Sequence, residues 1–370
     1  MKPIPASVSV IEAAWLESVL KEKKVIERPV SGIDIEPMGE GVGLMGEMAR
    51  LRIRYEKMAG DSNNFYKDPE TLVVKCAAQN ENRQVARILD FYNRESNFYN
   101  YLALSCPIKV PASFYSAVDQ DTYDCIFLME DLGDVTVSDQ IQGASFEQAV
   151  HSLEKIAEMH AKWWNRSTEY SWAYEVHSTE ELGRLRDFIY MPALEPAVSN
   201  FQDRIGSRNQ AIMRAVGEHY PELFGALSKG HHTFVHGDYR LDNIIYQDTD
   251  NGLDSKVLDW QISGKASPMF DVAYFLCQSL DADLCAATER ELLEIYHAKL
   301  VRQGIADYEF SDCWNDYRIF LLFCLIFPVS VGGSLDLGNE RGRNLAAVML
   351  DRNLAAIERL NSEEFLTGLL

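Results

Sequence analysis

The sequence lacks any cluster of basic residues. It has 56 Asp and Glu against 35 Lys and Arg, which gives a formal net charge of −21 at pH 7. A surface of this sign repels the phosphate backbone of nucleic acids and anionic lipid headgroups. We therefore expect neither a nucleic-acid partner nor a membrane partner. The charge itself fits two interpretations, a well-solvated surface or one that attracts a cationic substrate.

Paired cysteines are also lacking. The seven cysteines are an odd number, are widely scattered and form no C-x-x-C motif. Disulfide frameworks and structural zinc sites both require cysteines at characteristic spacings. We therefore expect reduced cysteines in the core of a cytoplasmic protein.

A run long enough to indicate a membrane span is missing as well. The most apolar stretch, IFLLFCLIFPVSV (Ile319–Val331), contains Pro328 and is shorter than the roughly 20 residues that a helix needs to cross a bilayer. The N-terminal stretch MKPIPASVSVIEAAWLESVL is interrupted by Pro, Glu and Ser, unlike a signal sequence. We expect Ile319–Val331 to form a buried helix.

Strand-like segments characterise the chain from about residue 31 to residue 131. They are ARLRIRYE (Ala49–Glu56), TLVVKCA (Thr71–Ala77) and DCIFLME (Asp124–Glu130). Between the last two, apolar residues recur at helical spacing over Asn82–Ala103, which predicts one helix. Residues 1–131 are therefore predicted to form a small antiparallel sheet with one packed helix.

Helical periodicity takes over in residues 132–370. The clearest helix is Ser145–Trp164, where Ser145 and Gln148 form a capping-box pattern before a regular apolar stripe. Further helices are predicted within Thr288–Gly304 and Ser311–Leu360. We predict a second, mostly helical domain over residues 132–370 and an α+β fold for the whole chain.

One segment of this second domain carries a dense set of polar groups, FVHGDYRLDNIIYQ (residues 234–247). A turn-rich stretch follows, and then KVLDW (Lys256–Trp260), which together predict a β-hairpin. Antiparallel pairing places Asn243 and Asp259 at the same end of that hairpin. An amide oxygen and a carboxylate, with room for waters, suit a Mg²⁺ ion that binds nucleotide phosphates. Asp238 precedes the hairpin and is placed to accept a proton.

The first domain contains Gly41-x-Gly43-x-x-Gly46. A dinucleotide-binding glycine motif should open a helix, but the residues after Gly46 alternate like a strand, so we favour a hairpin that covers a triphosphate. The strand Thr71–Ala77 is otherwise apolar, so a lysine at position 75 is unexpected unless its ammonium group has a partner.

These motifs resemble, in their order, those of the protein-kinase-like superfamily. HGDYRLDNIIY, VLDWQISGKASPMFDVAYFL, MEDLGDV and IAEMHAKWW resemble the aminoglycoside phosphotransferase and choline kinase family, and most closely its ecdysteroid-kinase-like members, over about residues 35–350. The resemblance implies a two-lobed protein-kinase-like fold, with a small antiparallel-sheet N-lobe and a large helical C-lobe. It also implies transfer of the γ-phosphoryl group of ATP or GTP to a small-molecule hydroxyl, with Mg²⁺.

The resemblance assigns roles to residues in both domains. In the N-lobe it implies nucleotide binding by Gly41, Gly43, Gly46, Lys75 with Glu95 as its ion-pair partner, and the hinge residues Met129, Glu130 and Leu132. In the C-lobe it implies a catalytic group made of His236, Asp238, Arg240, Asn243 and Asp259, of which Asp238 is the base and Asn243 and Asp259 hold the metal.

Three roles stay open at this point. His236 is expected to orient the loop by hydrogen bonding. Arg240 lies near the γ-phosphate or pairs with Asp242. The resemblance also suggests that Asp271 anchors the catalytic loop, although an Asp at a helix N-terminus needs no such role.

Only eight residues separate Asp259 from Pro268. This leaves no room for a long activation segment and peptide platform, so the acceptor is expected to be small. An aminoglycoside, a choline-like amino alcohol, a sugar and a steroid-like alcohol remain candidates, as do ATP and GTP, and a monomer or a dimer. The two alternative functions are a catalytically silent nucleotide-binding module and a metal hydrolase built on His236 and Asp238.

Overall fold

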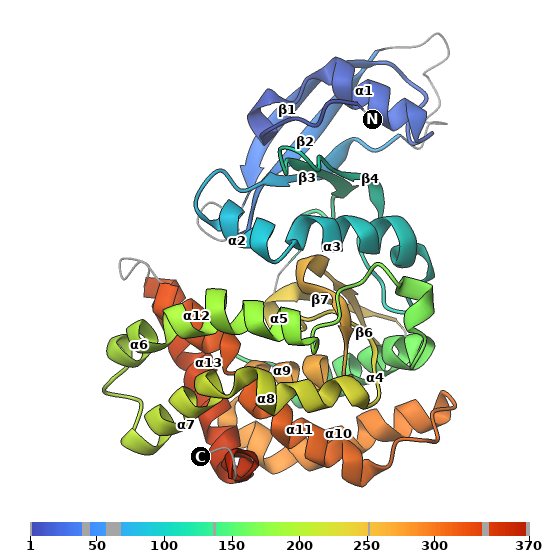
Figure 1. Ribbon diagram of the computed structural model, residues 1–370. Coiled ribbons are helices and arrows are strands. Elements are labelled where there is room, and N and C mark those ends of the chain that lie inside the picture. The colour runs from blue at the N-terminus through green and yellow to red at the C-terminus, as the bar shows by residue number, and fades with distance from the viewer. Residues whose placement is uncertain are drawn as a thin grey trace. The chain divides into compact units, whose positions relative to one another are not determined.

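The computed structural model describes residues 2–38, 45–56, 68–135, 138–250, 252–334 and 340–367. The chain divides into two compact units, residues 1–105 with 110–135 and residues 106–109 with 136–370. Figure 1 shows a sheet-rich first unit and a mostly helical second unit. This is the α+β content expected from the sequence.

The first unit is built on an antiparallel sheet of five strands in the order β1-β2-β3-β5-β4. The strands are β1 (Val30–Met38), β2 (Gly46–Tyr55), β3 (Thr71–Ala77), β4 (Ser113–Val118) and β5 (Cys125–Glu130). Three of them coincide with the predicted strand-like segments, and β1 and β4 complete the two edges.

Helix packing distinguishes the two faces of this sheet. Helix α1 (Ala13–Glu22), preceded by the short helix η1 (Val8–Val10), packs Leu16 and Leu20 against a face that includes Val74 and Leu128. Because side chains alternate along a strand, Lys75 on β3 and its neighbour Phe127 on β5 belong to the opposite face.

The helix predicted over Asn82–Ala103 is broken, so that prediction was wrong as a single element. The segment forms α2 (Asn82–Ile88), α3 (Phe91–Asn97), η2 (Phe98–Leu102) and η3 (Ala103–Ser105). Asp90 adopts a left-handed conformation with φ of 55°, which Asp tolerates better than most residues. Its carboxylate accepts hydrogen bonds from Asn93 at 2.7 Å and from the Tyr123 hydroxyl at 3.1 Å. These contacts hold the break that redirects α3.

The second unit consists mainly of helices, and its described residues also form two small two-stranded antiparallel sheets. Its α-helices are α4 (Phe146–Trp163), α5 (Thr179–Arg184), α6 (Met191–Asn200), α7 (Ser207–Glu218), α8 (Tyr220–Gly225), α9 (Met269–Ser279), α10 (Ala282–Arg302), α11 (Phe310–Phe323), α12 (Ile326–Ser334) and α13 (Glu340–Arg359). The short helical turns are η4 (Ser167–Tyr170), η5 (Leu185–Tyr190), η6 (Ala226–Lys229), η7 (Leu241–Asn243), η8 (Trp260–Ile262) and η9 (Ser362–Leu366). The sheets pair β6 (Thr233–Val235) with β9 (Gly264–Ala266) and β7 (Ile244–Thr249) with β8 (Gly252–Val257).

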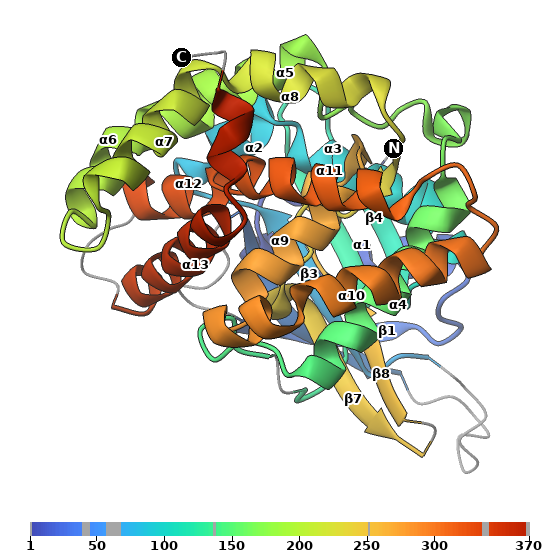
Figure 2. The same cartoon turned by 90° about the horizontal axis from the view of Figure 1, so that it is seen from below.

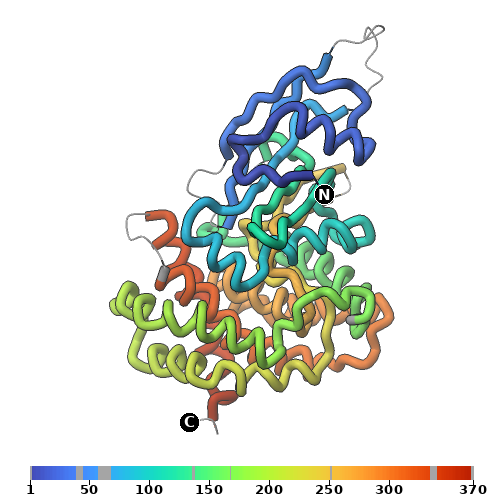
Figure 3. Tube along the Cα trace, turned by 45° about the horizontal axis from the view of Figure 1, so that its top comes forward, coloured from blue at the N-terminus to red at the C-terminus, as the bar shows by residue number. Residues whose placement is uncertain are grey.

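Helix α9 is the central helix of this unit. Every residue of α9 is buried, and the helix packs against α4, α10, α11 and α13 (Figure 2). The trace in Figure 3 places the C-terminal helix α13, in red, beside α12. The predicted capping box of α4 is present, because Gln148 N–H donates to Ser145 Oγ at 3.1 Å and Ser145 N–H to Gln148 Oε1 at 2.9 Å.

One segment assigned to the first domain from the sequence, Cys106–Lys109, belongs to the second unit. The reason is local, because Val257 N–H donates to the Lys109 carbonyl at 2.9 Å and the Lys109 ammonium pairs with Asp254. The segment is therefore attached to β8 in the second unit.

The apolar run Ile319–Val331 is buried as predicted but forms parts of two helices, α11 and α12. It lies within Phe310–Gly333, a 24-residue stretch that is long and apolar enough to cross a membrane by composition and 61% buried in its most apolar window. Pro328 falls in the first turn of α12, where a missing N–H costs nothing, so the chain starts a new helix there. The contacts of the run are those of core helices.

Candidate active site

Lys75 and Glu95 form a buried ion pair in the first unit. Lys75 Nζ lies 2.7 Å from Glu95 Oε2, and the two side chains are 8% and 2% exposed. A buried ammonium is unfavourable unless a carboxylate and hydrogen bonds compensate it. The break at Asp90 sets the direction of α3 and so brings Glu95 to β3. The predicted pair is present.

Gly46, the first residue of β2, lies directly against Lys75. A Cβ atom at this position would be 3.1 Å from Lys75 Cε and 3.1 Å from the Cys76 carbonyl oxygen, so any other residue would crowd the lysine. Gly41 and Gly43 lie outside the described residues. Of the predicted glycine motif, only the contact between Gly46 and Lys75 is therefore established.

The predicted hinge residues lie at the C-terminal end of β5 and in the loop after it. Met129 and Glu130 end β5, opposite Val73 and Leu72 of β3, and Leu132 lies in the loop that follows. Glu130 N–H donates to the Ala112 carbonyl at 2.8 Å, which fixes the end of the strand. Met129 and Lys75 belong to the same face because their positions in β5 and β3 alternate with the buried Leu128 and Val74.

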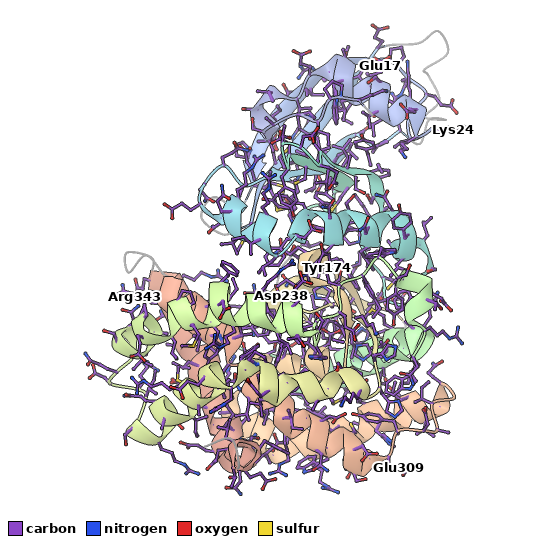
Figure 4. All side chains as sticks on the ribbon, in the orientation of Figure 1. Glu17, Lys24, Tyr174, Asp238, Glu309 and Arg343 are labelled. Atoms are coloured by element: carbon purple, nitrogen blue, oxygen red, sulfur yellow. The ribbon has the colours of Figure 1, made fainter. Side chains whose placement is uncertain are left out.

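In the second unit, the loop from His236 to Asn243 connects β6 to β7 and contains Asp238 (Figure 4). Gly237 has a φ of 83°. A Cβ atom there would lie 2.6 Å from the Ile262 carbonyl oxygen. Both the conformation and the close approach therefore require glycine.

Asp271 anchors the start of this loop. Its two carboxylate oxygens accept hydrogen bonds from the backbone N–H groups of His236 and Gly237, each at 2.8 Å. His160 Nε2 is 3.1 Å from the same carboxylate, and the other ring nitrogen of His160 lies 2.8 Å from the Tyr296 hydroxyl. Asp271 and His160 are fully buried. The anchoring contact of Asp271 that the resemblance suggested is present. His160 was predicted only to lie on the apolar face of a helix, and its contact with Asp271 was not predicted.

His236 connects the loop to the hairpin. Its Nδ1 accepts the backbone N–H of Asp238 at 3.1 Å, and its Nε2 lies 2.8 Å from the Leu258 carbonyl. A carbonyl only accepts, so Nε2 carries the proton and the ring is the neutral tautomer. Both nitrogens are thus used to hold Asp238 and the segment that leads to Asp259.

Asn243 holds Asp238 directly. Its Nδ2 donates to the Asp238 carbonyl at 2.9 Å and to Asp238 Oδ2 at 2.8 Å. Because both partners are acceptors, the amide orientation is fixed, and the oxygen of Asn243 is the atom that it can offer to a cation.

The hairpin places Asp259 at the same end as Asn243. Ile244 pairs with Val257, and Leu258 N–H donates to the Asn243 carbonyl at 2.9 Å. The predicted second strand, Lys256–Trp260, ends earlier than expected, because β8 stops at Val257 and Asp259 is left-handed with φ of 60° and ψ of 70°. The backbone thus turns at Asp259 instead of continuing along the ribbon.

Asp238 is 8% exposed, and its surroundings are strongly charged. Burial raises the pKa of Asp238, Arg240 lowers it, and the negative charge of Asp259 raises it. Arg240 Nη1 pairs with Asp242 Oδ2 at 2.6 Å, and its Nε lies 3.3 Å from Asp238 Oδ1. The pairing with Asp242 that the sequence left open is therefore present, together with a contact to Asp238.

Tyr274 is a site residue that the sequence analysis missed. Burial raises the pKa of both Asp238 and Tyr274. The Tyr274 hydroxyl lowers the pKa of Asp238, and the Asp238 carboxylate in turn raises the pKa of Tyr274 further, so the two groups are electrostatically coupled. The Tyr274 ring stacks on Phe327 with 3.7 Å between centroids and 10° between planes. The available signal was its spacing, because Tyr274 lies three residues after Asp271 on one helix and so shares a face with it.

The oxygen donors of the second unit fit Mg²⁺. No group of three or more His, Cys, Asp or Glu side chains that could hold a metal is found in the described part of the chain. An amide oxygen from Asn243 and a carboxylate from Asp259 are a sparse set of hard ligands, as Mg²⁺ accepts when phosphates and waters complete its shell. His236 uses both ring nitrogens within the protein, so the geometry argues against a hydrolase metal bound by His236 and Asp238.

Residues 40–304 match the model of the ecdysteroid kinase-like family. No curated protein matches significantly.

Among solved structures, choline kinase from Cryptosporidium parvum Iowa II has a TM-score of 0.50 at 13% identity and covers 96% of each chain. An ethanolamine kinase from Plasmodium vivax has a TM-score of 0.51 at 9% identity, over 96% of this chain and 89% of that one. The ADP-bound aminoglycoside phosphotransferase APH(2'')-Ib has a TM-score of 0.44 at 16% identity, over 96% and 99%. At these identities the likeness to the choline kinase and the ethanolamine kinase concerns the fold alone, which is protein-kinase-like.

The match to the family model covers more than half of the sequence and includes Lys75, Glu95, the His236–Asn243 loop, Asp259 and Asp271. The chain belongs to the ecdysteroid kinase-like family.

Proposed function

We propose that the protein transfers the γ-phosphoryl group of a nucleoside triphosphate, ATP or GTP, to a hydroxyl group of a small molecule. The observation that carries the proposal is the contact of Asn243 with Asp238, which holds a buried carboxylate in one orientation. Membership of a kinase-like family and a fold shared with choline and ethanolamine kinases support it.

In this proposal Asp238 is the catalytic base. It accepts the proton of the acceptor hydroxyl as the acceptor oxygen forms a bond to the γ-phosphorus, while the bond between that phosphorus and the bridging oxygen breaks and the nucleoside diphosphate leaves. Burial raises the pKa of Asp238, which makes it a better proton acceptor than an ordinary carboxylate. The Arg240 guanidinium near Asp238 would neutralise negative charge that develops on the transferred group.

The other groups bind the nucleotide. Lys75, held by Glu95, would bind the phosphates, with Gly46 leaving space beside it, and the backbone at Met129, Glu130 and Leu132 would pair with the base. A Mg²⁺ ion held by Asn243 and Asp259 would supply positive charge against the phosphates.

The acceptor is proposed to be small. The residues between Asp259 and α9 are occupied by η8 and by β9, which pairs with β6, so no long segment remains there to bind a peptide. The net charge of −21 favours a cationic acceptor such as an amino alcohol or an aminoglycoside, and a sugar or steroid-like alcohol is the neutral alternative.

The test is release of nucleoside diphosphate from Mg·ATP and from Mg·GTP in the presence of pooled amino alcohols, aminoglycosides, sugars and sterols. Asp238→Asn is the control, because it keeps the shape of the side chain and removes the base. Stimulation by one pool in the wild type but not in this variant is the expected result.

A catalytically silent nucleotide-binding module is the alternative. It predicts that Mg·ATP binds, as measured by calorimetry, without stimulated release by any pool. The retained Asp238, Asn243, Asp259 and Lys75 argue against it, because a silent module has no need of the base.

A further inference from the structure

The C-terminal helix α13 lies outside the segment that matches the family model, yet it carries a buried cation. Arg352 is 7% exposed. Its Nη1 donates to the carbonyls of Gln140 at 2.7 Å and Gln278 at 3.0 Å, and its Nη2 donates to the carbonyl of Ile141 at 3.0 Å. Burial lowers the pKa of Arg352, and within the described ranges no carboxylate forms an ion pair with it. A cation buried among carbonyls is costly, so its contacts need an explanation.

Gln140, the residue that Arg352 contacts, is fully buried and uses all of its polar atoms. Its side-chain oxygen accepts Leu241 N–H at 2.9 Å, and its side-chain nitrogen donates to the Gln278 carbonyl at 2.9 Å. Its backbone N–H donates to Asp242 Oδ1 at 2.9 Å. Gln140 thus joins the end of the catalytic loop to the last turn of α9.

The contacts continue to the proposed base. Asp242, held by Gln140 through one oxygen, holds Arg240 through the other at 2.6 Å. Arg240 in turn lies 3.3 Å from Asp238. A continuous series of contacts therefore runs from Arg352 through Gln140, Asp242 and Arg240 to Asp238.

The loop is consequently held at both ends by elements attached to α9. Asp271, in the first turn of α9, binds the start of the loop at His236 and Gly237. Gln140, bound to Gln278 in the last turn of the same helix, holds its end at Leu241 and Asp242. Arg352 donates to the carbonyl of Gln278 and so also stabilises the C-terminal end of the α9 dipole.

We propose that Gln140 and Arg352 are positioning residues for the catalytic loop, and that α13 is therefore required for turnover although it lies beyond the family match. The effect on turnover rests on the proposed kinase function. The effect on the structure of the loop does not, which allows the two to be tested separately.

The experiment compares Arg352→Met and Arg352→Lys with Arg318→Met in the full-length chain. Arg318 is a matched control on α11, because it too donates to backbone carbonyls, those of Leu360 at 3.0 Å and Asn361 at 3.4 Å. It also pairs with Glu364 at 2.7 Å, and none of these partners belongs to the loop or contacts Gln140 through a hydrogen bond. Amide hydrogen exchange is measured over peptides that cover residues 236–247, together with Mg·ATP turnover on the most active acceptor pool.

Arg352→Met is expected to speed exchange over residues 236–247 by about tenfold or more relative to Arg318→Met. It is also expected to lower kcat by about tenfold or more, with the KM for Mg·ATP changed by less than roughly twofold, because the base is misplaced while nucleotide binding is kept. Arg352→Lys keeps the charge and replaces the two terminal nitrogens of the guanidinium by a single ammonium nitrogen, so it should recover part of both losses. If Arg352→Met does not fold, Arg352→Lys alone is compared with Arg318→Met.

Equal exchange over residues 236–247 in the Arg352 and Arg318 variants would overturn the positioning role. Unchanged exchange cannot be explained by a missing acceptor, because the measurement needs no substrate. Conversely, faster exchange in a protein that shows no turnover in the wild type would uphold the positioning role and count against the proposed kinase function.

Discussion

The side-chain nitrogen of Asn243 donates two hydrogen bonds to Asp238, one to its carbonyl at 2.9 Å and one to its carboxylate at 2.8 Å. The two residues lie on one short loop, and the contact orients the carboxylate while it turns the amide oxygen of Asn243 away from Asp238. One side chain can therefore position the base and supply a metal ligand. Its two roles can be separated by substitution.

Asn243→Asp is expected to lower turnover about 100-fold or more, because the new carboxylate keeps an oxygen for the cation but loses both donated hydrogen bonds and repels Asp238. The measurement is kcat for nucleoside diphosphate release at saturating Mg·ATP. Asn200→Asp, a change of the same chemistry at an amide that instead donates to the Gly332 carbonyl at 3.0 Å, is the control for stability. Turnover within roughly threefold of wild type would show that the donated hydrogen bonds are dispensable.

The Lys75–Glu95 pair predicts an asymmetry between single and double variants. Glu95→Gln leaves a buried ammonium without its carboxylate, which should cost about 3 kcal/mol or more of unfolding free energy. Lys75→Met/Glu95→Gln removes the charge as well and should be closer to wild type in stability, although both variants should bind Mg·ATP weakly. Urea unfolding and calorimetry measure the two effects. A double variant less stable than Glu95→Gln would contradict the account of the pair as a compensated buried charge.

The contacts that the sequence predicted are those that depend on local patterns. The hairpin register follows from alternation and turn residues, so the proximity of Asn243 and Asp259 could be predicted without the structure. The ion pair of Lys75 with Glu95 followed from the family pattern and from the presence of a lysine in an apolar strand. In each case a short motif determines which atoms meet.

Contacts between segments that are distant in the chain could not be predicted. Gln140 contacts Leu241 across 101 positions and Arg352 contacts Gln140 across 212, and neither residue belongs to a recognisable motif. The break at Asp90 was missed for a similar reason. No proline or glycine marks it, and the left-handed conformation is supported by the Tyr123 hydroxyl, which comes from the loop before β5.

Tyr274→Phe is expected to lower kcat by about threefold to tenfold with little change in the KM for Mg·ATP, because it removes the hydroxyl that is electrostatically coupled to Asp238 and keeps the ring stacked on Phe327. The matched control is Tyr190→Phe, which removes a buried hydroxyl that donates to the Met213 carbonyl at 2.9 Å, away from the loop. Thermal unfolding of both variants shows whether stability alone explains a loss. An equal fall in kcat in the two variants would remove Tyr274 from the site.

His177 predicts how stability depends on pH. Its ring lies edge-on to Phe320 and Phe323 at 5.4 and 5.8 Å between centroids, and burial lowers the pKa of His177 to about 3. In the unfolded chain a histidine takes up a proton near pH 6.5. Below that pH the histidine is protonated in the unfolded state but stays neutral in the folded state. The unfolding free energy therefore falls as the pH falls, by about 2 kcal/mol between pH 7 and pH 5. Urea unfolding at both pH values should show this contribution in the wild type and its loss in His177→Leu, whereas the same pH dependence in both proteins would mean that the buried imidazole takes up its proton in the folded state.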